Sequence, residues 1–268
     1  MKTNPIFILG APRTGSTFLY QVMINYFGLS YLTNFTNKYF TKHPYIGTYL
    51  SLPFMGKVNY SSDYGKTNGL FGPSEASYIF RNWFGGEHPS ETKSCNILPG
   101  KEKSLIRTFK NKTIVTKNAW NCFRIWELVN LLPDIRFIWI KRNIMDSALS
   151  DLNSRYNRGS PDIWNSATPA NYKEIQKRPY WEQVVEQQHE YNRIIERDLK
   201  LYSKRYMVIQ YENFYGNFNK IVNEISYFIR IRPNFIVPRP YVENLENITI
   251  EDEKRVEVYY CGKTNSKI

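Results

Sequence analysis

The sequence predicts an α/β fold in three layers, with a central, mostly parallel sheet flanked by helices. Short apolar runs of strand length alternate along the chain with longer segments whose apolar residues recur every three or four positions. Hydrophobic residues make up 42% of the 268 residues, which is enough for a substantial core. No repeat or linker interrupts the pattern, so we expect residues 1–268 to form a single domain.

Each expected element follows from its local pattern. Strands are expected at the apolar runs 6–9, 113–117, 136–140 and 207–209. Helices are expected at 19–27, 122–130, 144–154, 179–202 and 221–229, the fourth opening on a proline that suits a first helical turn. Residues 31–100 are rich in Gly, Pro, Asn, Ser and aromatics and predict loops and short helices, while 156–178 predict a polar connection.

The net charge of +12 is spread along the chain. It fits either a solvated basic surface or a partner with several negative charges, such as a nucleic acid, an anionic polymer or a multiply charged nucleotide. No apolar run approaches the roughly 18–20 residues that span a bilayer, and the start of the chain lacks a signal-peptide pattern. We therefore expect no membrane span and a cytoplasmic location. The cysteines, Cys95, Cys122 and Cys261, predict free thiols without a disulfide framework or a metal site.

A glycine-rich segment between the first strand and the first helix has the spacing of a phosphate-binding loop. Gly10 and Gly15 match the glycines of G-x-x-x-x-G-K-[ST], a loop whose backbone N–H groups surround an anion at a helix N-terminus. Ser16 replaces the lysine that kinases and NTPases use on the β- and γ-phosphates, and Arg13 is the cation of the loop. The alternative is an ordinary turn capped by Ser16 or Thr17.

Two motifs resemble the nucleotide-binding signature of sulfotransferases that use PAPS (3′-phosphoadenosine-5′-phosphosulfate). The segment Pro12-Arg13-Thr14-Gly15-Ser16-Thr17 is similar to that family's 5′-phosphosulfate loop, P-[KR]-[ST]-G-[ST]-[ST]. Arg142 at a strand end and Ser150 eight residues later match its 3′-phosphate motif, where a guanidinium and a hydroxyl bind the phosphate. The resemblance implies a P-loop NTPase-like fold, with PAPS as the donor and PAP as the product.

Weaker similarities extend over most of the chain. They are Gly72-Pro73-Ser74-Glu75 ahead of Trp83-Phe84, Trp181-Glu182-Gln183-Val184, Tyr211-Glu212-Asn213-Phe214 and Gly262-Lys263. The last resembles a C-terminal loop that closes on the nucleotide, which implies a binding role for Lys263. The first resembles a segment of bacterial and carbohydrate-type sulfotransferases.

The resemblance also implies a mechanism. An acceptor hydroxyl or amine, with carbohydrates among the candidates, attacks sulfur in line; the protein supplies cations near the bridging oxygen and a base. Arg13 and Lys117 are the expected cations. Glu75 is the expected base, with His43 and His88 as alternatives. The family requires no metal, and no metal-ligand pattern is visible in the sequence.

Three rival functions remain open. A nucleotide kinase would need the missing loop lysine and Mg²⁺ ligands. A nucleic-acid-binding module would show a basic stripe with interleaved aromatics, and although aromatic residues make up 16% of the chain, no such motif is found. The third is a family member that binds PAP without catalysis. The acceptor and the oligomeric state stay open.

Overall fold

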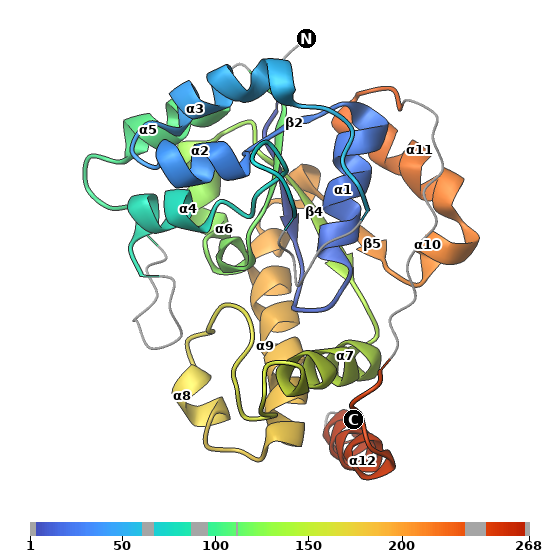
Figure 1. Cartoon of the computed structure of the whole chain (residues 1–268). Helices are drawn as coiled ribbons and strands as arrows, with labels where there is room; N and C mark the ends of the chain where they lie inside the picture. The colour runs from blue at the N-terminus through green and yellow to red at the C-terminus, as the bar shows by residue number, and fades with distance from the viewer. Residues whose placement is uncertain (1–3, 61–66, 87–95, 111, 234–244, 266–268) are drawn as a thin grey trace.

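A five-stranded, fully parallel sheet forms the centre of the protein in a computed structural model (Figure 1). The structure describes residues 4–60, 67–86, 96–110, 112–233 and 245–265. The strands lie in the order β2-β3-β1-β4-β5. Their bounds are Ile6–Leu9 for β1, Ser30–Tyr31 for β2, Ile114–Lys117 for β3, Arg136–Lys141 for β4 and Tyr206–Gln210 for β5. The predicted α/β fold with a parallel sheet is confirmed.

Helices cover both faces of the sheet (Figure 1). From the first to the eighth α-helix, the bounds are α1 Ser16–Phe27, α2 Asn34–Tyr39, α3 Pro44–Ser51, α4 Ser77–Phe84, α5 Glu102–Phe109, α6 Ile125–Leu131, α7 Ile144–Tyr156 and α8 Tyr172–Ile175. The remaining α-helices are α9 Tyr180–Lys200, α10 Asn213–Gly216, α11 Phe218–Ile229 and α12 Ile250–Asn265. Short 3-10 turns occupy η1 Leu52–Phe54, η2 Ala119–Phe123 and η3 Ser203–Arg205.

The strands divide their side chains between two hydrophobic cores. On β1, Ile6 and Ile8 pack with α1 and α11, whereas Phe7 and Leu9 pack with α4, α5, α6 and α9. The register aligns Phe7 with Phe137 of β4, whose ring lies in the same core. Burial on both faces explains why these strands appear in the sequence as continuous apolar runs.

A third core lies where α7, α9 and α12 pack together, at the edge of the sheet where the strands end (Figure 1). Leu149 and Leu152 of α7 face Val184 and Val185 of α9, and Val256 of α12 closes the group. This packing fixes the position of α7, the helix that carries Ser150.

Several elements differ from the sequence expectation. Strand β2 and helices α5, α8, α10 and α12 were not predicted, and α8 lies within the expected connection 156–178. The loop expected at Gly262-Lys263 is wrong, because both residues lie within α12. The expectation of short helices within 31–100 is confirmed by α2, α3 and α4.

Candidate active site

Four strands end at one edge of the sheet, and a candidate loop or side chain lies at or directly after each of these ends. The loop after β1 begins at Gly10, β3 ends at Lys117, Arg142 follows β4 and Tyr211 follows β5. Because all these strands are parallel, their carboxyl ends lie at the same edge, where ligands bind in open α/β sheets.

The loop after β1 has the backbone geometry of an anion cradle. Arg13 and Gly15 adopt left-handed conformations, with φ of 65° and 82°. Such alternation turns successive backbone N–H groups toward one side, and α1 begins directly afterwards with no acidic residue in its first turn. At Gly10 a Cβ atom would lie 2.6 Å from Thr14 Oγ1 and 2.9 Å from the Ile140 carbonyl oxygen, so a side chain there would displace the loop.

Several hydrogen bonds hold this loop in place. Thr14 Oγ1 donates to the Ala11 carbonyl over 2.8 Å, and Gln188 of α9 donates to the Pro12 carbonyl over 3.0 Å. The Cys122 thiol donates to the Gly10 carbonyl over 3.5 Å. Burial raises the pKa of that thiol to about 12, so it remains a protonated donor.

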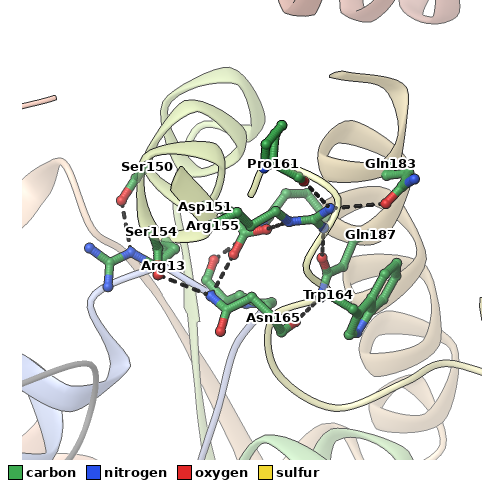
Figure 2. Close-up of polar contacts among 12 residues, drawn as sticks. Arg13, Ser150, Asp151, Ser154, Arg155, Pro161, Trp164, Asn165, Gln183 and Gln187 are labelled. Atoms are coloured by element: carbon green, nitrogen blue, oxygen red, sulfur yellow. Dashed lines mark hydrogen bonds and ion pairs between the residues drawn. The ribbon is translucent and has the colours of Figure 1, made fainter. Parts of the chain in front are cut away.

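Arg13 joins the two sequence motifs in space. Its Nε donates to Ser150 Oγ over 2.9 Å, across 137 positions of sequence (Figure 2). Its carbonyl oxygen accepts a 2.9 Å hydrogen bond from Nη1 of Arg142. The 5′ loop and the proposed 3′-phosphate residues therefore form one cluster of two guanidinium groups and a hydroxyl.

Tyr211 completes this cluster and was not predicted as a site residue. The Arg142 guanidinium lies 4.8 Å from the centre of the Tyr211 ring, a cation–π distance. The same ring lies so close to Gly15 that a Cβ there would come within 2.4 Å of it. The backbone N–H of Tyr211 donates to the Lys141 carbonyl over 2.7 Å. The signal that could have identified Tyr211 is its position directly after the last strand.

Glu75 and Lys117 form an ion pair beside the start of α1. Lys117 Nζ donates to Glu75 Oε1 and, over 3.3 Å, to Thr17 Oγ1. The Lys117 side chain is 14% exposed and that of Glu75 is 28% exposed, so both can contact solvent or a ligand. Asn118 fixes the Glu75 backbone through a 3.0 Å hydrogen bond to its carbonyl, just before Ala76 turns in a left-handed conformation into α4.

The other predicted residues lie elsewhere. Lys263 is on α12, where it forms an ion pair with Glu186 of α9, and its binding role stays a prediction. His43 is exposed at the start of α3, with its ring edge-on to Tyr45 at 5.9 Å. His88 lies outside the residues that the structure describes.

A buried polar network lies next to Ser150 along α7 and was not visible in the sequence (Figure 2). Arg155 and Asp151 form a fully buried ion pair with a 3.0 Å distance from Nε to Oδ2. Arg155 also donates to Gln183 over 3.0 Å and to Gln187 over 2.9 Å, both on α9. Asn165 donates to the other Asp151 oxygen over 2.7 Å, which anchors the connection between the two helices.

Comparison with known proteins identifies the family. A family model described as Sulfotransferase family matches residues 5–232. The chain belongs to the sulfotransferase family. No curated protein matches the chain at a significant level.

Solved structures of bacterial sulfotransferases share the fold. STF9 from Mycobacterium avium is similar with a TM-score of 0.51 at 12% identity, covering 98% of this chain and 69% of its own. STF1 from Mycobacterium tuberculosis has a TM-score of 0.50 at 13% identity, covering 98% of this chain and 77% of its own. A sulfotransferase from Alicyclobacillus acidocaldarius has a TM-score of 0.50 at 14% identity, covering 98% and 93% of the two chains.

Two further properties of this sulfotransferase concern metals and membranes. In the part of the chain that the structure describes, no group of three or more His, Cys, Asp or Glu residues is placed to hold a metal ion. Among the described helices, none combines the length and the hydrophobicity needed to span a bilayer.

Proposed function

We propose that this sulfotransferase moves a sulfuryl group from PAPS to a hydroxyl or amine of an acceptor, by direct in-line transfer. The observation that supports it best is the hydrogen bond from Arg13 to Ser150. The bond joins the motif that resembles the 5′-phosphosulfate site to the one that resembles the 3′-phosphate site. PAPS carries both groups on one nucleotide, so the two motifs must lie close together to bind it.

The donor would bind along the carboxyl edge of the sheet. In this proposal the backbone and hydroxyls of Pro12, Arg13, Thr14, Gly15, Ser16 and Thr17 surround the phosphosulfate. Arg142 and Ser150 bind the 3′-phosphate, with Tyr211 orienting the guanidinium. The kinase alternative is less well supported, because Ser16 replaces the phosphate-binding lysine and β3 ends in a cation, Lys117, instead of a magnesium-binding aspartate.

The transfer itself needs a proton acceptor and cations. The acceptor oxygen forms a bond to sulfur as the bond from sulfur to the phosphate oxygen breaks, and the electron pair leaves with PAP. Glu75 takes the acceptor proton, while Lys117 and Arg13 stabilise the negative charge that grows on the bridging oxygen. Lys117 contacts both Glu75 and Thr17, and these contacts support a base close to the phosphosulfate loop.

We propose a small molecule or carbohydrate as the acceptor. The sequences of the segments 31–100 and 156–178 contain Tyr and Trp, and we expect these segments to form the acceptor pocket, as loops on such folds usually do. Aromatic side chains suit sugars and phenols alike, so the acceptor class has to come from experiment.

The decisive experiment is a transfer assay with PAPS and a panel of sugars, phenols, alcohols and amines. We expect PAP to appear together with a sulfated product, both detected by chromatography and mass spectrometry. The Arg13→Ala variant should lose activity, since its charge acts on both the bound donor and the transition state. Phosphate transfer from ATP to any of these acceptors, without PAP formation from PAPS, would contradict the proposal.

A further inference from the structure

Helix α3 has its polar and apolar sides reversed with respect to solvent. The side that packs on the protein consists of Pro44, Gly47, Thr48 and Ser51, which are small or polar. The opposite side exposes large apolar residues at helical spacing, continued through η1. This surface, the α3 face, comprises Ile46, Tyr49, Leu50, Leu52 and Phe54. A surface helix normally has the reverse arrangement.

The polar side of α3 has a structural reason to face inward. Ser51 Oγ donates to the Gly47 carbonyl over 2.7 Å, and its oxygen lies 3.0 Å from Thr33 Oγ1. A Cβ on Gly47 would meet Phe40 Cβ at 2.7 Å, so α3 approaches α2 too closely for larger side chains. The hydroxyl cluster and the close packing therefore fix the rotation of α3 and leave its apolar side outward.

The exposure of the α3 face is large for side chains of this kind. Tyr49 is 67% exposed, Phe54 61%, Leu50 46% and Ile46 39%. Figure 1 shows α3 along the rim of the molecule beside α2 and α5. Several large, exposed apolar side chains on one helix and the turn that follows it are a feature of interaction sites.

Cations flank this face. Lys112 Nζ lies 5.6 Å from the centre of the Tyr49 ring, and the Arg107 guanidinium lies 5.8 Å from that of Tyr45. Lys38 lies 5.1 Å from the ring of its neighbour Tyr39 on α2. The first acidic residue of the sequence is Asp63, so α2, α3 and η1 contain none.

We propose that the α3 face binds an anionic lipid surface, with its apolar side chains in the interfacial region and the flanking cations on lipid phosphates. Aromatic and aliphatic side chains bordered by Lys and Arg are the chemistry of helices that lie on membranes. A second copy of the chain fits less well, because a twofold interface would bring together two cationic surfaces on which α2, α3 and η1 offer no acidic partner. This inference does not depend on the proposed sulfuryl transfer.

Vesicle co-sedimentation tests this proposal with the full chain. We expect binding to phosphatidylcholine vesicles that contain phosphatidylserine, weaker binding at high salt, and little binding to phosphatidylcholine alone. The triple variant Tyr49→Ser, Leu50→Ser, Phe54→Ser should bind at least about tenfold more weakly.

A control variant removes three apolar side chains that are even more exposed, on other surfaces. Leu201, Tyr227 and Val258 are 71%, 88% and 72% exposed, on or beside α9, α11 and α12. Their triple replacement by serine should leave vesicle binding unchanged, and both variants should retain the melting temperature of the parent. The proposal is overturned if the parent does not bind the anionic vesicles or if both triple variants bind alike. It is also overturned if the α3 variant converts a dimer to a monomer in sedimentation without changing vesicle binding.

Discussion

At the scale of single residues, Arg142 is the side chain whose role is easiest to isolate. Its guanidinium contacts the Arg13 carbonyl and the Tyr211 ring. The ring packs at the margin of a hydrophobic core, but Arg142 itself is half-buried and lies outside the three cores. We expect Arg142→Ala to weaken PAP binding by about 1.5–3 kcal/mol, the usual range for a charge-assisted hydrogen bond, while the protein stays folded. Calorimetric titration with PAP measures the change. Replacement of the exposed Arg232 by alanine is the control, and equal affinities in the two variants would refute the assignment.

Glu75 is the residue on which the proposed chemistry depends. Glu75→Gln keeps the size of the side chain and removes the proton acceptor, so turnover should fall by roughly 10²–10⁴-fold with little change in PAP binding. The assay is steady-state sulfuryl transfer to the acceptor found by screening. His43→Gln is the comparison, because His43 and His88 were the alternative bases and His43 contacts the ring of Tyr45 and the backbone of Phe40 in its own segment. If His43→Gln, and not Glu75→Gln, abolished turnover, the base would be His43.

At the scale of secondary-structure elements, the Arg155–Asp151 pair connects α7 to α9. Arg155→Met would leave the Asp151 carboxylate buried without its countercharge, and we expect the free energy of unfolding to fall by about 3–5 kcal/mol. Denaturant titration measures it. Lys200→Met breaks an exposed pair of the same i,i+4 spacing, with Glu196, and should cost less than about 1 kcal/mol. The double variant Asp151→Leu, Arg155→Met should recover part of the loss, because no charge is then left buried alone. A loss for Arg155→Met as small as the one expected for Lys200→Met would show that the buried pair is not important for stability.

Asp252 attaches helix α12 to α7 and α9, because its carboxylate accepts hydrogen bonds from the hydroxyls of Tyr156 and Tyr180. The carboxylate is buried, which by itself raises its pKa, but hydrogen bonds from Thr249 Oγ1 at 2.7 Å and Tyr180 OH at 2.7 Å lower the pKa below its ordinary value. A folded-state pKa below the unfolded one means that the stabilisation is present above the unfolded value, about 3.9, and is lost as the pH falls through the folded value.

We therefore expect the melting temperature to drop in acid, and Asp252→Asn to be destabilised at neutral pH with a flatter acid dependence. Melting curves from about pH 6, above the unfolded pKa, down to about pH 2 follow this loss. Glu251→Gln, an exposed change in the same helical turn, should keep the acid dependence of the parent. Parallel curves for the parent and Asp252→Asn would rule out this role of Asp252.

At the scale of the whole molecule, the sequence predicted the parts of the fold that are encoded locally. Strands β1, β3 and β4 are buried on both faces and therefore appear as apolar runs. The edge strand β5 exposes Val208 and was predicted from its short apolar run alone. Strand β2 has only two residues, Ser30 and Tyr31, which is too short to produce a pattern. In α12, Val256 is the fully buried apolar residue among many charges, so its helical periodicity is weak.

In the candidate site too, the residues in contiguous motifs were predictable and the contacts between distant segments were not. Pro12 to Thr17, Arg142 and Ser150 lie in contiguous motifs, and the structure brings them together. Tyr211 lies in a segment that resembles the family and directly follows β5. Its contact with Arg142, like the Arg155 network, joins distant segments, and local spacing does not encode it. We propose that the chain forms one domain, because β1 contributes to both cores that flank the sheet.

Nucleotide binding should stabilise the whole molecule, and the choice of nucleotide tests the site directly. PAP and ADP carry the same number of phosphates, but only PAP has one at the 3′ position, next to the proposed ligands Arg142 and Ser150. At a concentration of 100 times its Kd, PAP should stabilise the folded state by about 2.7 kcal/mol, which corresponds to a rise in melting temperature of roughly 5–10 °C for a chain of this length.

ADP at the same concentration should give a clearly smaller rise, since it lacks the contacts to the 3′-phosphate. In Arg142→Ala the difference between the two nucleotides should shrink, because the variant removes the charge that distinguishes them. Thermal shifts of the parent and of Arg142→Ala, each measured with PAP and with ADP, give the four values that this comparison needs. Equal shifts with PAP and ADP in the parent would mean that the cluster of Arg13, Arg142 and Ser150 does not recognise the 3′-phosphate, and the donor assignment would have to be abandoned.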